Sequence, residues 1–260
     1  MLWFSLLISH KASTPYTLIL LKGIEADSKT ASIPFFWRAA TGLNSFYKLK
    51  TLLSELHFLP SIASFCYFKA ADEILLEACE NYQKGSYRNR CYIVGANGLQ
   101  RLSIPLEKGK NNQLLIREVA LNFHQDWPRQ HWQSIRSAYG NAPFFPYYAD
   151  ELMPIFIDPP ALLWDFNLAF LKTIFRLLQW DKPIHTTKEF RTQHEENIYD
   201  IRQKVTPKFY PPNGTYQEKF TAYPQVFRER HGFMANLSIL DLLFCQGPQA
   251  NLYLSENYSS

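Results

Sequence analysis

Between residues 50 and 79, two short apolar segments enclose a segment with the spacing of a helix. Residues 50–54 and 73–79 have the length and composition of strands, and the second is apolar enough to be largely buried. Pro60 suits the first turn of the helix between them, because proline needs no hydrogen-bond partner there. A strand, a helix and a strand in succession indicate an α/β fold.

A β-hairpin is predicted next, around the dipeptide Asn97-Gly98. Asparagine and glycine both tolerate positive φ, so this dipeptide suits the two central positions of a type I′ turn. The flanking residues 91–96 and 99–106 have the apolar pattern of strands, and residues 117–121 form a further strand candidate.

The remainder of the chain favours helices. Helical spacing and end signals predict three of them, at residues 127–139, 161–179 and 237–246. Residues 144–157 are aromatic and contain Pro146 and Pro154 as breaks, and residues 186–224 show only weak structural signals. We therefore predict a single α/β domain, with an N-terminal strand-helix-strand and hairpin sheet and a mainly helical C-terminal half.

Charge is distributed unevenly along the chain. Residues 1–50 hold six basic and two acidic residues, whereas the remaining residues hold 21 of each. The formal net charge of +4 thus comes entirely from the first fifth, which argues against a nucleic-acid-binding protein. We expect residues 1–48 to be an extension, either loosely packed or the product of a start codon placed too far upstream. Residues 49–254 are expected to form the domain, and residues 255–260 a tail.

The four cysteines, Cys66, Cys79, Cys91 and Cys245, have none of the spacings of a zinc site. We expect buried, reduced thiols in a cytoplasmic protein. No apolar run reaches the roughly 18 residues that a membrane-spanning helix needs. The motifs of dinucleotide-binding proteins, P-loop proteins, zinc proteases and α/β-hydrolases are missing, so the sequence indicates no metal and no cofactor. It does not define the oligomeric state.

An acidic segment is followed by a basic one. Residues 70–83 contain four acidic residues and no basic one, whereas residues 84–117 contain seven basic residues and one acidic residue. Arg88 and Arg90 would share one face of an extended segment, where two guanidinium groups can grip the phosphates of a nucleotide-linked sugar. The alternative is that these arginines pair with Glu77, Glu80 or Asp241 inside the fold. In the first case Arg88→Ala would cost little stability, and in the second about 3 kcal/mol.

Further residues are candidates for the same site. Tyr82 and Tyr87 could stack on the base or the sugar. His131, near the start of a predicted helix, and Glu77 are candidates for the general base. His231 precedes Gly232, which would let the backbone approach a ligand. Each of these residues could instead have a structural or surface role, and convergence on one concave surface would distinguish a functional site from these alternatives.

Three ordered blocks of the chain resemble the WbqC-like family of bacterial proteins. They are Asn81–Lys84 with Ser86–Cys91, Gly95–Gly98 and Leu102–Leu106; His131-Trp132, Ser137–Tyr139 and Ala142–Phe145; and Arg230–Phe233, Asn236–Ile239 and Asp241–Phe244. The resemblance covers residues 49–254 and is closest to members from Bacteroidetes-type bacteria. Leu56–Pro60 and Cys245 depart from the pattern, and residues 1–48 have no counterpart in it. Asn89 is also predicted to bind the substrate, because it belongs to the first of these blocks.

The resemblance implies a role in bacterial cell-surface polysaccharide biosynthesis, including O-antigen. It suggests a transferase that adds an acyl or aminoacyl group to a nucleotide-linked amino sugar. It supplies no catalytic residue set. A non-catalytic scaffold or accessory protein of the same pathway, with the basic hairpin as its docking face, remains the alternative.

Overall fold

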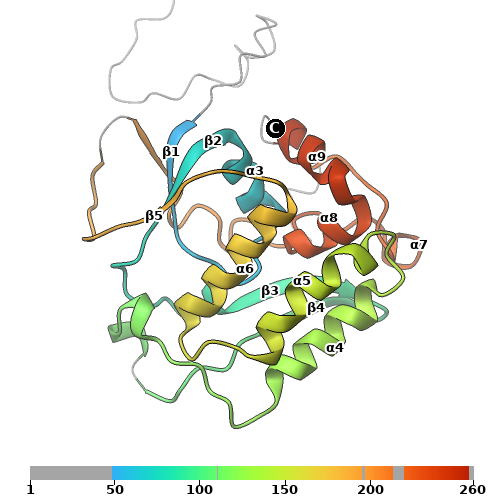
Figure 1. Cartoon of the computed structure of the whole chain (residues 1–260), viewed down its shortest axis with the longest axis horizontal. Coiled ribbons are helices and arrows are strands. Elements are labelled where there is room, and N and C mark those ends of the chain that lie inside the picture. The colour runs from blue at the N-terminus through green and yellow to red at the C-terminus, as the bar shows by residue number, and fades with distance from the viewer. Residues whose placement is uncertain (1–48, 110, 195–196, 213–219, 258–260) are drawn as a thin grey trace, which may run out of the picture. The chain divides into compact units, whose positions relative to one another are not determined.

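The computed structural model describes residues 49–109, 111–194, 197–212 and 220–257. The predicted extension, residues 1–48, lies outside the described residues. The helices and strands follow one another in the order shown in Figure 1.

A parallel sheet forms around the first predicted strand. It contains β1 (Leu49–Ser54), β2 (Ala71–Leu76), β5 (Ile184–Thr186) and β6 (Ile198–Asp200), in the order β5-β2-β1-β6. Every neighbouring pair is parallel. Helix α3 (Ile62–Ala70) provides the crossover from β1 to β2, which confirms the predicted strand-helix-strand unit. The sequence did not predict β5 and β6.

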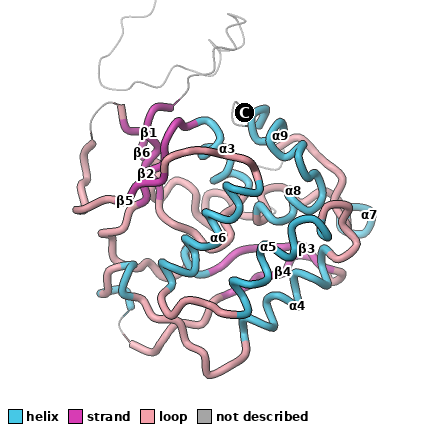
Figure 2. The backbone as a smooth tube through the Cα atoms, in the orientation of Figure 1, coloured by secondary structure: helices cyan, strands magenta, loops and turns pink. Residues whose placement is uncertain are grey.

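The strands of the predicted hairpin form a second, antiparallel sheet, drawn apart from the first in Figure 2. They are β3 (Arg90–Gly95) and β4 (Gly98–Ser103). The predicted position of the turn is wrong by one residue, because Gly95 pairs with Gly98 and the turn residues are Ala96 and Asn97. Backbone φ is positive at Gly98 (+97°) but at neither of these two, so the turn is not type I′. A turn with negative φ followed by a glycine with positive φ is the pattern of a type I turn with a glycine bulge.

We expect Gly98→Ala to lower the free energy of unfolding by about 1 kcal/mol or more, because its φ disfavours any residue with a Cβ. Gly95→Ala is the matched control, since that φ is not positive and the new Cβ would meet only Gln100 Oε1, at 3.5 Å. Denaturant unfolding of both variants measures the difference. Equal stability of the two variants would contradict the assigned turn.

The C-terminal half is mainly helical, as predicted. Its helices are α4 (Trp127–Tyr139), α5 (Phe145–Ile157), α6 (Leu163–Leu177), α7 (Arg228–His231), α8 (Ile239–Gln246) and α9 (Ala250–Asn257). Two expectations are wrong. Residues 117–121 form no strand, because residues 117 and 118 belong to a 3-10 turn, Ile116–Glu118, and Ala120 and Leu121 make only isolated bridges. Helix α5 runs through Pro154 without a break. None of the helices described has both the length and the hydropathy of a transmembrane segment.

The core lies between the parallel sheet, the hairpin and these helices. Helix α4 packs on β3 and on α5, and α5 packs on α6 (Figure 1). Phe58, four residues beyond the end of β1, stacks on Phe166 and meets Phe170 of α6 edge-on, which joins the sheet to the helical half. All four cysteines are free thiols, and three of them are buried as expected; Cys79 is only half-buried.

Candidate functional site at the carboxyl edge of the sheet

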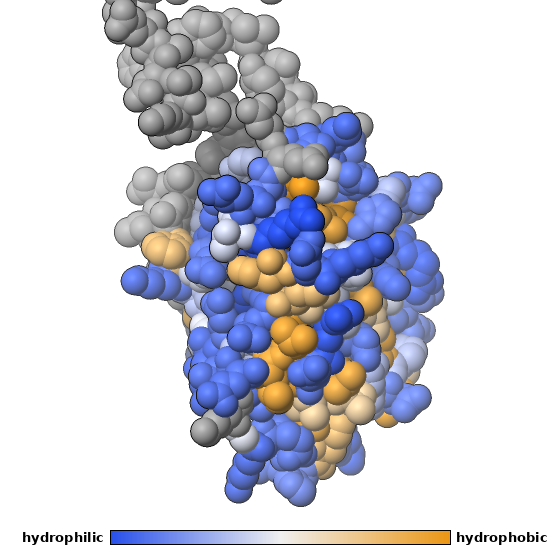
Figure 3. Space-filling view, turned by 90° about the vertical axis from the view of Figure 1, so that its left-hand side faces the viewer, coloured by the Kyte–Doolittle hydropathy of each residue, from blue (hydrophilic) through white to orange (hydrophobic). Residues whose placement is uncertain are grey.

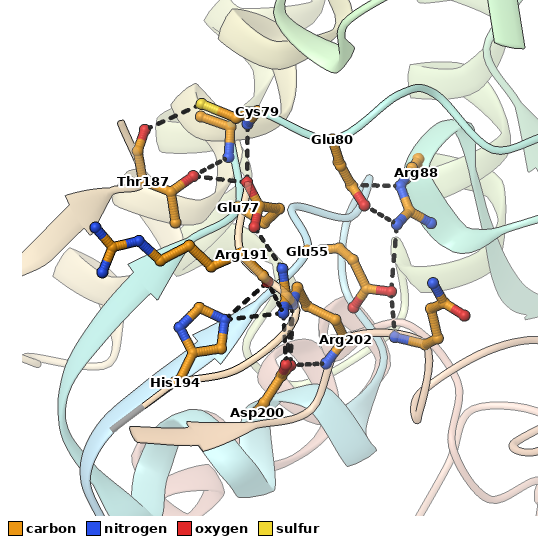
Figure 4. Close-up of polar contacts among 12 residues, drawn as sticks. Glu55, Glu77, Cys79, Glu80, Arg88, Thr187, Arg191, His194, Asp200 and Arg202 are labelled. Carbon is orange, nitrogen blue, oxygen red and sulfur yellow. Dashed lines mark hydrogen bonds and ion pairs between the residues drawn. The ribbon is translucent and has the colours of Figure 1, made fainter. Parts of the chain in front are cut away.

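Polar side chains follow all four parallel strands at the edge where the strands end. Glu55 follows β1, Glu77 follows β2, Thr187 follows β5, and Arg202 lies two residues beyond β6. In open parallel sheets, ligands bind outside the carboxyl ends of the strands. The parallel topology therefore explains why residues distant in sequence meet at this edge (Figure 4).

Glu77 lies at the centre of one half of this cluster and is fully buried. Its carboxylate accepts hydrogen bonds from the backbone N–H of Cys79 (2.9 Å), from Thr187 Oγ1 (2.7 Å) and from an Arg202 Nη (2.6 Å). The strand ends at Leu76, so Glu77 lies just beyond it and not within it as predicted. Each oxygen of this carboxylate already has a partner.

Arg202 connects Glu77 to the rest of this half. Its guanidinium also binds Asp200 at 2.7 Å, lies 4.9 Å above the ring of Phe190 and contacts His194 Nε2 at 2.9 Å. The same His194 nitrogen also lies 3.1 Å from the carbonyl oxygen of Arg191. Burial raises the pKa of the Asp200 carboxyl, but the hydrogen bonds from Arg202 outweigh it and the net shift is downward.

Arg88 holds the other half together. Its guanidinium makes a bidentate pair with Glu80, at 2.7 and 2.6 Å, and reaches Glu55 Oε1 at 3.3 Å. The backbone N–H of Gln203, a residue with φ of +62°, donates to the same Glu55 oxygen at 2.6 Å. Burial raises the pKa of the carboxyls of Glu55 and Glu80, although Arg88 opposes the rise in both.

This pairing is the alternative that the sequence left open for Arg88. Its side chain is 1% exposed, and its donors point at Glu80 and Glu55 rather than outward. Of the other two proposed partners, Glu77 pairs with Arg202, and Asp241 accepts hydrogen bonds from Tyr223 and Gln225. Arg88 is thus held within the fold by carboxylates.

Sequence reasoning missed Glu55, although its surroundings are unusual. It is 1% exposed, and its Oε2 is buried with no hydrogen-bond partner. His57 Nε2 lies 3.9 Å from that oxygen. Burial, with a smaller effect from Arg88, lowers the pKa of His57 to about 3, so no ion pair forms. The sequence feature that could have identified Glu55 is that it is a single acidic residue directly after an apolar strand.

A cavity of about 530 Å³ adjoins this cluster. Its lining is Cys79, Glu80, Asn81, Tyr82, Gln83, Lys84, Asn112 and Phe190. Cys79 and Glu80 link it to the residues that follow β2, and Phe190 links it to Arg202. We call it the carboxyl-edge cavity. Figure 3 shows a strip of hydrophobic residues on the side of the molecule where β5 lies, and Phe190, 50% exposed, belongs to the segment that follows β5.

The structure separates the predicted substrate-binding residues of the first block. Tyr82 lines the carboxyl-edge cavity. Arg90 is half-buried, and its Nε has no hydrogen-bond partner among the described residues. Tyr87 is buried and donates its hydroxyl hydrogen to the carbonyl of Tyr210 at 2.6 Å. Asn89 donates to the carbonyl of Ile104 at 3.0 Å.

The two predicted histidines lie in other surroundings. His131 on α4 is buried between Trp127 and Phe58, and burial lowers its pKa to about 4. His231 contacts the hairpin turn, with Nε2 at 3.0 Å from the carbonyl oxygen of Ala96. Neither histidine lines the carboxyl-edge cavity. Their proposed roles remain predictions.

Among the residues that the structure describes, no three histidine, cysteine, aspartate or glutamate side chains are arranged to hold a metal ion. The described cluster instead pairs its carboxylates with arginines.

Comparison with known proteins supports the resemblance seen in the sequence. The model of the WbqC-like protein family matches residues 56–215, which include most of the carboxyl-edge cluster. An uncharacterized protein of Mycobacterium tuberculosis, Rv1507c, is 27% identical over 237 residues, covering 79% of this chain and 97% of that protein. No solved structure matches the chain. The chain belongs to the WbqC-like protein family.

Proposed function

We propose that the chain is a transferase of bacterial cell-surface polysaccharide biosynthesis that binds a nucleotide-linked amino sugar in the carboxyl-edge cavity. The observation that carries the proposal is the position of this cavity, against a buried charged cluster where parallel strands end. The polysaccharide context comes from the family resemblance. A cytoplasmic location belongs to the same proposal, because activated sugars are made there.

The cavity lining has the chemistry that such a ligand needs. The amides of Asn81, Gln83 and Asn112 can both donate to and accept from sugar hydroxyls. Of the two aromatic residues in the lining, the half-exposed Phe190 offers its face to a sugar ring or a base, whereas Tyr82 is buried. Lys84 supplies a positive charge for a phosphate.

Glu80 is the carboxylate best placed to act as the base in this reaction. It lines the cavity, whereas Glu77 and His131 do not. Burial raises its pKa, and Arg88 fixes its orientation through two hydrogen bonds. In the proposed step the sugar amine forms an amide bond with the carbon of an activated acyl donor, and the donor's leaving group departs with its bonding electrons. The amine proton passes to Glu80.

The alternative is a non-catalytic scaffold or accessory protein of the same pathway. Two exposed apolar side chains near the cavity favour it. Phe190 is 50% exposed, and Leu114, whose carbonyl accepts a hydrogen bond from the backbone N–H of Tyr82, is 37% exposed. Such side chains suit a protein partner as well as a sugar.

A thermal-shift screen of nucleotide-linked amino sugars tests the proposal. We expect one nucleotide sugar to raise the melting temperature of the wild type, and Phe190→Ala to remove at least half of that shift. Phe209→Ala is the matched control, because Phe209 is also 50% exposed and does not line the cavity. No shift with any nucleotide sugar would favour the scaffold. An equal loss in both variants would place the ligand elsewhere.

A further inference from the structure

The register of the hairpin brings two arginines onto one of its faces. Arg90 of β3 pairs with Ser103 of β4, and Tyr92 pairs with Arg101. Paired residues of an antiparallel ladder point to the same side, and so do alternate residues along one strand. These four side chains therefore share one face, opposite to the face that contacts α4 through Gln100. We call it the outer hairpin face.

Arg101 is the neighbour of Arg90 on this face, and Arg88 is not. Arg88 belongs to a 3-10 turn, Tyr87–Asn89, whereas Arg90 is the first residue of β3. The two do not lie on one extended segment, and the Arg88 guanidinium binds Glu80 within the fold. Arg101 is two residues from the pairing partner of Arg90, and long side chains at such diagonal positions can reach one another.

Neither arginine of the outer hairpin face has a counter-ion among the described residues. No hydrogen bond or ion pair there involves the side chain of Arg90 or Arg101, although Arg90 is half-buried and its Nε is buried. By contrast, Arg88 and Arg202 each pair with two carboxylates. A partly buried guanidinium has lost hydration, and like charges on one sheet face repel each other. An anion from outside the chain would supply the missing partner.

The outer hairpin face is next to the tyrosines of the first block. The ring of Tyr87 meets the ring of Tyr92 edge-on, with 6.2 Å between their centroids. Burial raises the pKa of the Tyr82 hydroxyl, and the charge of Arg90 lowers it by a smaller amount. Arg90 acts in the same direction on Tyr87, where burial again has the larger effect. The Arg90 guanidinium is thus close enough to act on Tyr82, a residue that lines the carboxyl-edge cavity.

We propose that Arg90 and Arg101 together bind a diphosphate group on the outer hairpin face. Two guanidinium forks match the several acceptor oxygens and the multiple charges of a diphosphate, whereas one carboxylate carries a single charge. In the proposed transferase this group would be the diphosphate of the nucleotide-linked sugar. The identity of that ligand rests on the proposed function, whereas the phosphate site rests on the arginine pair alone.

Titration calorimetry on the full chain tests this inference, with inorganic pyrophosphate as the probe and succinate as a dicarboxylate control. We expect pyrophosphate to bind more tightly than succinate. Arg90→Gln and Arg101→Gln should each weaken pyrophosphate binding about tenfold or more, the effect of losing a charged hydrogen bond. Arg117→Gln, at an exposed arginine outside the hairpin strands, is the matched control and should leave the binding unchanged.

The melting temperature without ligand shows whether the two glutamine variants remain folded. Both should melt at or slightly above the temperature of the wild type, because neither change removes a described hydrogen bond or ion pair and each removes one of two like charges. A large fall in the melting temperature of Arg90→Gln would show that Arg90 has a structural partner, and that result would contradict the phosphate site.

Two further measurements separate this inference from the proposed function. Phe190→Ala should leave pyrophosphate binding unchanged, and Arg90→Gln and Arg101→Gln should each reduce the thermal shift by the nucleotide sugar. If no nucleotide sugar binds but pyrophosphate binding requires both arginines, the phosphate site stands and the transferase proposal fails. If pyrophosphate binds no more tightly than succinate, or binds both glutamine variants as tightly as the wild type, the arginine pair is not a phosphate site.

Discussion

Arg88→Ala is expected to lower the free energy of unfolding by about 3–5 kcal/mol, because it leaves buried carboxylates without their partner. Arg88 is 1% exposed and donates to Glu80 and Glu55, which are 6% and 1% exposed. Most of this loss of stability comes from leaving the buried charges of Glu80 and Glu55 unpaired, and less of it comes from losing their attraction to Arg88. Denaturant unfolding at pH 7 measures it.

Two comparisons make this result specific. Arg101→Ala, at an exposed arginine, should change stability by no more than about 0.5 kcal/mol. Adding Glu80→Gln to Arg88→Ala should recover part of the loss, because one of the unpaired carboxylates is then removed. If Arg88→Ala kept the melting temperature of the wild type and lost only nucleotide-sugar binding, Arg88 would be a phosphate clamp and the pairing described above would not matter.

Asp241→Asn is expected to stabilise the protein at pH 8 by up to about 3 kcal/mol. Burial raises the pKa of the Asp241 carboxyl from 3.8 to about 6, despite the hydrogen bonds from Tyr223 and Gln225. A shift of this size corresponds to about 3 kcal/mol. The folded state therefore holds this proton more tightly than the unfolded state, and folding is penalised as the pH rises from about 4 to about 6. Above that range the penalty is complete.

Asparagine keeps the geometry of this site while removing the charge. Its carbonyl can accept from Tyr223 and Gln225 as the carboxylate does. Its uncharged amide nitrogen takes the place of Asp241 Oδ1, which is buried with no hydrogen-bond partner among the described residues. The gain in the free energy of unfolding should be about half as large at pH 5 as at pH 8, since the wild-type carboxyl is mostly protonated in the folded state at pH 5. Urea unfolding at pH 5 and pH 8 measures both values. A gain that is the same at both pH values, or a loss at pH 8, would show that the carboxyl is not the source of the penalty.

The first half of the fold could be predicted because its signals are local. The strand before Glu55, the helix after Pro60 and the hairpin around Asn97 each follow from residues that are adjacent in sequence. The hairpin turn was misplaced because asparagine and glycine suit positive φ, whereas the structure uses that property only at Gly98. The strands β5 and β6 were missed because three residues are too few for an alternating pattern. Their pairing depends on β2 and β1.

The candidate site could be predicted only in part, because some of its residues meet only through pairing between strands that are distant in sequence. The uneven distribution of charge pointed to Glu77, Glu80 and Arg88. The position of Tyr82 in the first block that resembles the family pointed to that residue. Arg202 could not be assigned, because its partner Glu77 is 125 residues away and the two meet only through the order of the sheet. His131 looked catalytic from its place near a helix start, but the aromatic rings of Trp127 and Phe58 that surround it come from packing.

Alkylation of Cys79 measures most directly whether the carboxyl-edge cavity binds a ligand. Cys79 lines this cavity and is the only one of the four cysteines that is not buried, so Cys66, Cys91 and Cys245 serve as internal references. The rate of iodoacetamide labelling at each cysteine is followed by mass spectrometry, with and without each nucleotide-linked amino sugar. We predict that one of these compounds slows the labelling of Cys79 severalfold and leaves the other three unchanged. Labelling of Cys79 at the same rate with every compound, including any that shifts the melting temperature, would contradict a binding site at this edge of the sheet.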